Sequence, residues 1–354
     1  MTKPLDPADM AVCRALLKGG SRTFHAASKV LPAWVSDPAI ALYAFCRLAD
    51  DAVDLEPNRA AAVERLRHRL DRAYRAQPMD FAADRAFAAV VARFSIPREL
   101  PEALLEGLAW DAQGRRYETL PELYSYAARV AGAVGAMMTL VMGQRTPEIV
   151  GRACDLGVAM QLTNIARDIG EDARDGRLYL PGSWLRDAGI DPDAWLAKPV
   201  FSTEIAAIVQ RLLDAADALY GRATLGIANL PLSCRPGIYA ARALYAEIGR
   251  ELERGGLDSV ARRAVVSTRR KLMVLTRTLA LLETDWVRAM KFSPGAELEE
   301  TRFLIEAVVA MPVQGTVQPA KVRAKPIEDR VVWVIDLFAR LERRDQLQRS
   351  GLFR

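Results

Sequence analysis

Two short stretches of the sequence carry several acidic side chains at the spacing of one helical face. In the first, RLADDAVD at residues 47–54, Asp50 and Asp54 are four apart and Asp51 lies between them. Residues four apart on a helix lie one turn above the other on the same side. Close carboxylates repel by roughly 1 kcal/mol at about 4 Å in water, and by about 4 kcal/mol at an effective dielectric of 20. The cluster is typical of a cation site, although a solvated acidic helix end has the same pattern.

The second stretch is NIARDIGEDARDGRLYLP at residues 164–181. Its Asn164, Asp168 and Asp172 are spaced four apart, and Asp175 follows at three. The apolar residues of the same segment follow a different stripe, which we expect to face the core: Val158, Leu162, Ile165 and Ile169. A polar face beside a core-facing stripe is expected for a cavity wall. A surface helix with solvated charges is the alternative.

The residue types in the two clusters favour magnesium and diphosphate. Magnesium prefers oxygen ligands and usually binds through one or two carboxylates together with substrate phosphate oxygens and water. Each cluster also carries an arginine, Arg47 one turn before Asp51 and Arg167 beside Asp168. Arginine binds phosphate oxygens in a bidentate manner and keeps its charge. Carboxylates, magnesium and arginines together would form a site for a diphosphate leaving group.

Other catalytic chemistries have little support in the sequence. The chain has two histidines, His25 and His68, and no H-E-x-x-H, Walker A or G-x-G-x-x-G motif. Ser21 has no histidine base placed by spacing, so covalent catalysis is not indicated. No C-x-x-C pair occurs, and we expect free, mostly buried thiols at Cys13, Cys46, Cys154 and Cys234.

Composition indicates a globular, cytoplasmic protein. Of the 354 residues, 51% are hydrophobic and 26% charged, and the formal net charge is +5. The charge suits a phosphorylated substrate, an anionic membrane or nucleic acid, but no basic patch with interleaved aromatics supports nucleic acid. The N-terminus lacks a signal-peptide pattern. The longest uncharged, mostly apolar run, 130–143, is too short to span a membrane.

Apolar residues recur at three- and four-residue spacing through most of the chain, and alternating strand patterns are missing, which predicts an all-α fold. The expected helices include 59–76, 146–172, 203–228 and 239–254, and one that starts with an N-cap at Ser36-Asp37-Pro38. Turns are expected at 95–97, 175–176, 181–182 and 235–237.

The C-terminal part of the chain is expected to lie apart from this bundle. Residues 313–329 contain prolines and no apolar periodicity, which is typical of a linker. Beyond them, 330–354 includes an amphipathic helix at 331–347 with Trp333, Leu337 and Phe338 on its apolar side. We therefore divide the chain into a catalytic domain at 1–312, the linker and this helix.

The two acidic stretches resemble the two aspartate-rich motifs of the squalene/phytoene synthase family. The second is long and specific, especially in its continuation to RLYLP, and the first supports it. The similarity extends from about Ser21 to Lys271, through SRTF, ALYAFCRLADDAVD, RVAGAVG, QLTNIARDIGED, ARALYAEI and RRAVVSTRRK.

The resemblance implies an isoprenoid-synthase fold, a bundle of antiparallel helices around a deep central cavity. It implies that magnesium, or manganese as a substitute, is bound by Asp50, Asp54, Asn164, Asp168 and Asp172. Diphosphate and substrate contacts would come from Ser21, Arg47, Gln161, Arg167, Tyr245 and Arg263. The aspartates Asp50, Asp54, Asp168 and Asp172, with Arg47, Arg167 and Tyr245, would be the catalytic residues.

The resemblance also implies the reaction. Two geranylgeranyl diphosphates would condense head to head through prephytoene diphosphate to phytoene, with no nicotinamide cofactor. The residues at 130–141, among them Gly132, Gly135, Met137 and Met138, would line a dry apolar cavity, or the glycines would merely allow close helix packing. Because the product is a hydrocarbon, we expect transient contact with a membrane surface, and downstream carotenoid enzymes as further partners.

One departure and three alternatives remain. Family members often carry a tyrosine where this chain has Ala128, so Tyr126, Tyr245 or another ring would take its part. A synthase using farnesyl diphosphate to make a C30 product is the nearest alternative. A chain-elongating prenyl transferase or terpene cyclase is a second, and a non-catalytic helical module at a membrane surface is a third.

Overall fold

The structure is a computed structural model that describes residues 5–20, 28, 30–56, 58–277 and 296–311. The linker and the C-terminal helix expected after residue 312 therefore lie outside the described residues, as does Ser21. Within the described ranges the chain forms helices and no strand, as expected, and residues 268–277 are also helical. The elements are α1 (Pro7–Gly20), α3 (Ala33–Leu55), α4 (Arg59–Tyr74), α5 (Ala82–Phe94), α6 (Glu99–Ala112), α7 (Leu120–Ala127), α8 (Ala133–Val141), α9 (Pro147–Arg174), α10 (Gly182–Asp187), α11 (Pro192–Ala197), α12 (Thr203–Ile227), α13 (Arg235–Arg254) and α15 (Arg302–Ala310).

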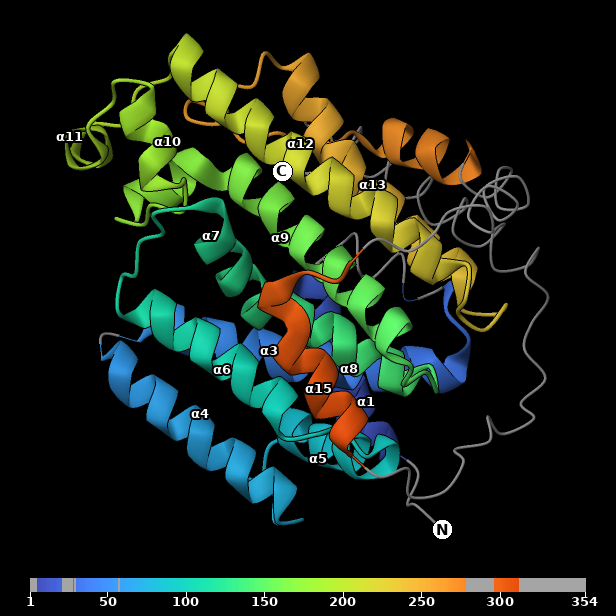
Figure 1. Ribbon diagram of the computed structural model, residues 1–354. Coiled ribbons are helices and arrows are strands. Elements are labelled where there is room, and N and C mark those ends of the chain that lie inside the picture. Colours follow the sequence, from blue (N-terminus) through green and yellow to red (C-terminus); the bar gives the residue numbers. More distant parts are fainter. Residues whose placement is uncertain (1–4, 21–27, 29, 57, 278–295, 312–354) are drawn as a thin grey trace, which may run out of the picture.

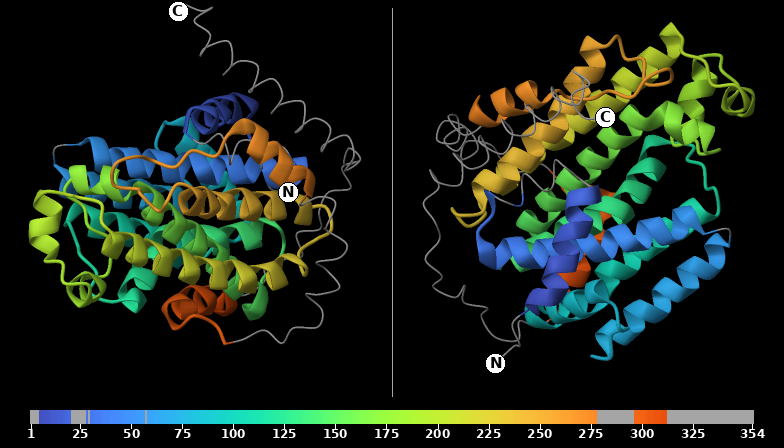
Figure 2. Two further views of the ribbon diagram at one scale, coloured as in Figure 1. Left: turned by 90° about the horizontal axis from the view of Figure 1, so that it is seen from above. Right: turned by 180° about the vertical axis from the view of Figure 1, so that it is seen from behind.

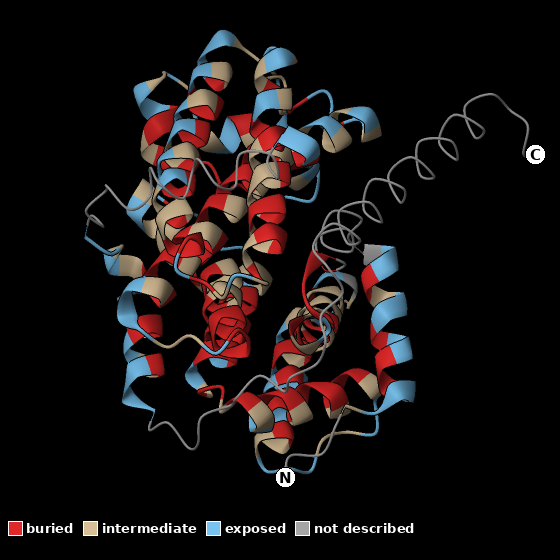
Figure 3. Cartoon of the chain, turned by 90° about the vertical axis from the view of Figure 1, so that its right-hand side faces the viewer, coloured by how far each residue is buried: buried red, intermediate tan, exposed pale blue. Residues whose placement is uncertain are grey.

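Helix α9 is the central element of the bundle (Figure 1). It packs against α8, α12 and α13 and also contacts α7 and α15. On the other side, α3 packs on α1, α4, α5 and α6. Figure 2 shows these helices stacked side by side, and Figure 3 shows that their buried faces point into the bundle. The two helices that carry the acidic motifs, α3 and α9, thus belong to two groups of helices that face each other.

Two expected helix boundaries are wrong. Helix α3 begins at Ala33, capped by Pro32, so Pro38 lies inside the helix instead of at its first position. The backbone N–H groups of Val35 and Ser36 donate to the carbonyl of Pro32, which starts the helix one turn earlier than Ser36. Helix α13 begins at Arg235, where a turn was expected, because Pro236 is tolerated in the first helical turn.

The other helix boundaries agree with the sequence to within about two residues, but the turn expected at 181–182 is the start of α10, whose first residue is Gly182. Helix α9 ends at Arg174, so Asp175 caps it instead of lying on its face. The turn at Ser95 is present, with this residue in the left-handed conformation (φ 47°). The turn at 175–176 is present as well, with Gly176 at φ 74°.

Helices α7 and α8 are joined without a break by a π-helical turn, Ala128–Gly132. The backbone N–H of Ala133 donates to the carbonyl of Ala128, five residues earlier. Beyond this turn α8 lies unusually close to α9. A Cβ atom on Gly135 would meet the carbonyl oxygen of Ala153 at 2.3 Å, and one on Gly157 would meet that of Ala131 at 2.4 Å. These two glycines are required for the close approach of the backbones.

Candidate active site

A cavity of about 640 Å³ lies between α3, α6, the π-helical turn with α8, α9, α12 and α13. Its size is within the usual range of small-molecule sites, about 300–1,000 Å³. The residues of α9 that line it run from Ile149 to Arg167, which corresponds to about 27 Å along the helix axis. The cavity is therefore long enough for an extended chain of many carbon atoms.

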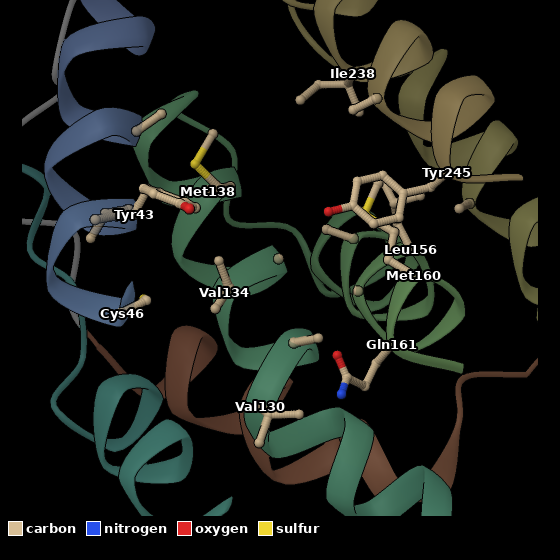
Figure 4. Close-up of a pocket in the computed structure, with 18 of the residues that line it drawn as sticks. Tyr43, Cys46, Val130, Val134, Met138, Leu156, Met160, Gln161, Ile238 and Tyr245 are labelled. Atoms are coloured by element: carbon tan, nitrogen blue, oxygen red, sulfur yellow. The ribbon is translucent and has the colours of Figure 1, made fainter. Parts of the chain in front are cut away.

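The two ends of the cavity differ in chemistry. Towards Arg167 the lining is polar and charged, with Arg47, Asp50, Asp111, Gln161, Asn164, Tyr245 and Arg263. Further along α9 it is mostly apolar, with Val130, Val134, Met138, Leu156, Met160 and Ile238 projecting from the surrounding helices (Figure 4). Gly135 also lines the cavity, so this glycine both faces the cavity and lets α8 approach α9. Gly132 and Met137, which were expected in the lining, are buried but do not line it.

The first acidic face extends along the last two turns of α3. Asp50 lines the cavity and is 3.7 Å from Nη1 of Arg47. Burial, together with the negative charge of Asp54, raises the pKa of Asp50 to about 6. Asp51 does not line the cavity and accepts hydrogen bonds from Arg47, with Nη2 at 2.6 Å from Oδ1. Asp54 is paired with Arg177, from the segment that follows α9.

The second acidic face lies near the end of α9. Asp168 is held between two arginines, with Nε of Arg167 at 2.8 Å and Nε of Arg263 at 2.7 Å from Oδ1. Within the described part of the chain, Asp172 forms no ion pair. Burial, and then the charge of Asp168, raise its pKa to about 7. Asn164 lies two turns before Asp172 on the same face and lines the cavity.

Arg263 reaches Asp168 because the segment that carries it is docked on α9. The backbone N–H of Gly170 donates to the carbonyl oxygen of Ser259 at 3.0 Å. A Cβ atom on Gly170 would lie 2.1 Å from the carbonyl oxygen of Val260, so no larger residue fits here. The glycine of the second motif therefore positions a distant arginine at the acidic face.

The structure brings most of the expected site residues to one end of the cavity. Arg47, Asp50, Gln161, Asn164, Arg167, Tyr245 and Arg263 line it directly. Asp54, Asp168 and Asp172 do not line the cavity. Asp54 pairs with Arg177 and Asp168 with Arg263, and the charge of Asp168 helps to raise the pKa of Asp172. Their roles towards metal and substrate stay predictions.

Two residues of this end were missed by the sequence interpretation. Arg177 pairs with Asp54 across 123 residues of sequence. Asp111, on α6, accepts hydrogen bonds from the hydroxyl groups of Tyr126 and Tyr179. Arg177 follows the second motif and could have been suspected from that position. Asp111 stands alone between Trp110 and Ala112, so no local pattern marks it.

The acidic faces have the donor chemistry that a hard cation requires. No three His, Cys, Asp or Glu side chains in the described ranges converge into a closed metal cage. Instead, Asp50 and Asp172 carry raised pKa values because burial and, after it, nearby carboxylates oppose their ionisation. A cation between them and the phosphate oxygens of a substrate would relieve that repulsion. The residues therefore fit magnesium bound jointly by protein and substrate.

Four findings describe what this chain is similar to. Residues 17–271 match the family model described as squalene/phytoene synthase. The chain is 48% identical to a phytoene synthase from Cereibacter sphaeroides, over 98% of this chain and 97% of that protein. It is 55% identical to a phytoene synthase from Rhodobacter capsulatus, over 77% of this chain and 81% of the relative. Among solved structures, a dehydrosqualene synthase in complex with ligand superposes with a TM-score of 0.72 at 30% identity, covering 78% of this chain and 97% of that one.

The extent of these matches decides the family. The matched model covers both acidic faces and the arginines that contact them, from α3 to Arg263. The described helices also have the architecture of a synthase from this group, as the superposition shows. The chain belongs to the squalene/phytoene synthase family.

Proposed function

We propose that the chain is a phytoene synthase, which joins two geranylgeranyl diphosphates head to head and releases two diphosphates. The observation that carries the proposal is the cavity with two acidic, arginine-bearing helix faces at one end and apolar walls beyond them. Relatives that are 48% and 55% identical bear this name, which supports the choice of substrate.

The residues of the polar end would bind and orient the diphosphates. Asp50, Asp54, Asn164, Asp168 and Asp172 would hold magnesium, which would neutralise the diphosphate and help it to leave. Arg47, Arg167 and Arg263 lie where they could turn from aspartate to phosphate oxygens. Such contacts strengthen as charge develops on the leaving group, so they lower the barrier to ionisation.

The apolar end would bind the hydrocarbon tails and exclude water. Ionisation would leave an allylic cation, which the double bond of the second substrate attacks. The tertiary cation formed in this attack would lose a proton as the cyclopropane ring of prephytoene diphosphate closes. That intermediate would ionise again, rearrange and lose a proton to give phytoene. Water would capture either cation, so the apolar wall formed by Val130, Val134 and Met138 serves the reaction by remaining dry.

The test is incubation of the protein with geranylgeranyl diphosphate and magnesium, followed by identification of the hydrocarbon. We expect phytoene and two diphosphates per product, without NADPH. A parallel incubation with farnesyl diphosphate tests the C30 alternative. A synthase of that kind would convert farnesyl diphosphate to a C30 hydrocarbon faster than it converts geranylgeranyl diphosphate. A strict need for NADPH would move the protein to the squalene-forming branch.

We also propose that the protein binds membranes reversibly when it releases product. None of the described helices is both long and apolar enough to cross a bilayer. Transfer of a hydrocarbon into water costs about 0.8 kcal/mol per methylene-sized unit, so delivery to a bilayer is favoured. The net charge of +5 suits an anionic surface. Sedimentation with anionic liposomes at low salt should retain the protein and high salt should release it, whereas no binding at low salt would refute the proposal.

A further inference from the structure

Asp111 is a carboxylate of the cavity wall that belongs to neither acidic motif. It lies in the last turn of α6 and lines the cavity beside Asp50 and Tyr126. Its Oδ2 accepts a hydrogen bond from the hydroxyl of Tyr126 at 2.8 Å, and its Oδ1 accepts one from that of Tyr179 at 2.7 Å. An ionised carboxylate oxygen can accept more than one hydrogen bond, so each oxygen keeps acceptor capacity.

The two tyrosines hold the carboxylate in a fixed orientation. Tyr126 comes from α7 and Tyr179 from the segment after α9, so three parts of the chain meet at Asp111. Their rings stack with centroids 5.2 Å apart, and Tyr117 packs on Tyr126 at the same centroid distance. All three rings are at most 8% exposed. Packing of this kind fixes the direction of the hydroxyl groups.

Asp111 also lies near both acidic faces. Burial raises the pKa of Asp111 to about 6, while the two tyrosines and Arg177 oppose the shift and Asp54 adds to it. In turn, its charge contributes to the raised pKa values of Asp50 on α3 and Asp172 on α9. In the metal-free protein the carboxylate is therefore a stronger base than an ordinary aspartate, and it lies in the polar part of the cavity lining.

We propose that Asp111 is a catalytic base, which accepts the proton lost by the final cation when phytoene forms. The proposal rests on the proposed function. In this step a C–H bond next to the cationic carbon breaks and its electron pair forms the new carbon–carbon double bond. The proton passes to a carboxylate oxygen of Asp111, and the cation is discharged without an external oxidant or reductant. Tyr126 and Tyr179 are positioning residues that keep the acceptor oxygens directed at the cavity.

The decisive experiment compares Asp111→Asn with wild type in the full-length protein supplied with geranylgeranyl diphosphate and magnesium. Asparagine has nearly the same shape but cannot accept the proton. We expect phytoene formation to fall by about 100-fold or more. Release of the first diphosphate should continue, with prephytoene diphosphate or water-captured alcohols in place of phytoene. The magnesium concentration for half-maximal release of that diphosphate should not rise.

Three further variants make the result specific. Asp111→Glu keeps a base and should restore part of the phytoene yield. Tyr126→Phe and Tyr179→Phe together should reduce the phytoene fraction of the products, since the carboxylate is then free to rotate. Tyr117→Phe is the matched control, because it belongs to the same ring cluster but its hydroxyl forms no hydrogen bond among the described residues. It should leave the product distribution unchanged.

Other outcomes would overturn the proposal in distinguishable ways. If Asp111→Asn loses diphosphate release together with phytoene and needs more magnesium, Asp111 acts in the diphosphate site and is not the base. If the variant makes phytoene at the wild-type rate, Asp111 has no part in the chemistry. If wild type itself makes no phytoene, the proposed function is wrong. Far-UV circular dichroism and thermal unfolding of each variant exclude misfolding as the cause.

Discussion

The acidic faces of α3 and α9 have the same spacing but different surroundings. In each face one of the predicted metal ligands is closely paired with arginine, Asp54 on α3 and Asp168 on α9. Each also carries one aspartate whose pKa is raised, Asp50 to about 6 and Asp172 to about 7. The second face is the more strongly held, because Asp168 contacts two arginines whereas Asp54 contacts one.

The comparison separates two uses of a carboxylate in the same site. Asp172 forms no ion pair among the described residues and Asp50 has only the 3.7 Å contact with Arg47, so these two depend most on a bound cation. Asp54 and Asp168 already have cationic partners, which could be released to phosphate when substrate and magnesium arrive. A test of the site should therefore compare Asp50 and Asp172 with Asp54 and Asp168, although each of these pairs contains one residue from each motif.

Removal of the cation should have the largest effect. Excess chelator should abolish phytoene formation, because neither acidic face can approach diphosphate without a cation. Added magnesium should restore it, and manganese should substitute. The measurement is hydrocarbon yield before and after metal is added back to the same sample. Full turnover in chelator would refute the metal assignment for both faces at once.

The next largest effect should come from Asp50→Asn and Asp172→Asn. Each should lower turnover by about 1,000-fold, the scale expected when a principal electrostatic contact is lost. Thermal stability of the metal-free protein at pH 8 should rise in both variants. The raised pKa means that the folded state binds more protons than the unfolded state between about pH 4 and 7, so charging these groups at higher pH destabilises the fold. A lower unfolding temperature would contradict this account.

Asp54→Asn and Asp168→Asn should have smaller effects on turnover, about 100-fold, and the opposite effect on stability. Both variants leave an arginine without its partner, so the unfolding temperature should fall. Kinetics and thermal scans on all four Asn variants provide the comparison. If Asp168→Asn is as stable as wild type and as inactive as Asp172→Asn, the proposed division between the two pairs fails.

Acidification should weaken magnesium binding, although protonation of the same groups stabilises the metal-free fold. Asp172 and Asp50 must be ionised to bind metal, and they gain protons as the pH falls through about 7 and about 6. The magnesium concentration for half-maximal activity should therefore rise several-fold between pH 8 and pH 6. A magnesium requirement that stays constant over this range would show that neither group is a ligand.

The smallest effect should come from Asp51→Asn and Asp175→Asn. Asp51 pairs with Arg47 and does not line the cavity, and Asp175 caps the end of α9. We expect losses of only about two- to five-fold, the size of a surface ion pair, because Asp175 caps α9 through its backbone N–H, which asparagine keeps. The measurement is steady-state turnover, with Asp50→Asn and Asp172→Asn assayed in parallel as controls. If Asp51→Asn or Asp175→Asn lowers turnover as much as those two variants do, the replaced aspartate belongs to the functional part of the acidic face.

Much of the fold and site could be predicted because the information is local. The four-residue spacing of Asn164, Asp168 and Asp172 placed them on one face of α9, and the apolar stripe beside them indicated a cavity wall. The start of α3 was misjudged because Pro38 has the same sequence signature whether it begins a helix or lies within it. Local patterns cannot show how distant segments pack.

Contacts between distant segments account for most of what was missed. The pairing of Arg177 with Asp54 depends on how the chain returns from α9 to α3. Asp111 has no acidic or periodic neighbours, and only the tertiary arrangement of α6, α7 and the segment after α9 gives it two tyrosine donors. Such a residue can be found from the structure but not from spacing.

The π-helical turn at Ala128–Gly132 has a consequence for insertions and deletions. This turn holds one residue more than an α-helical turn needs, and it separates Tyr126 on α7 from the cavity-lining residues of α8. Loss of one residue here would let an ordinary α-helix form. Helix α7 would then be rotated by about 100° relative to α8. Tyr126 would then point away from Asp111 although both residues are still present. In this segment the number of residues is therefore constrained more tightly than their identity.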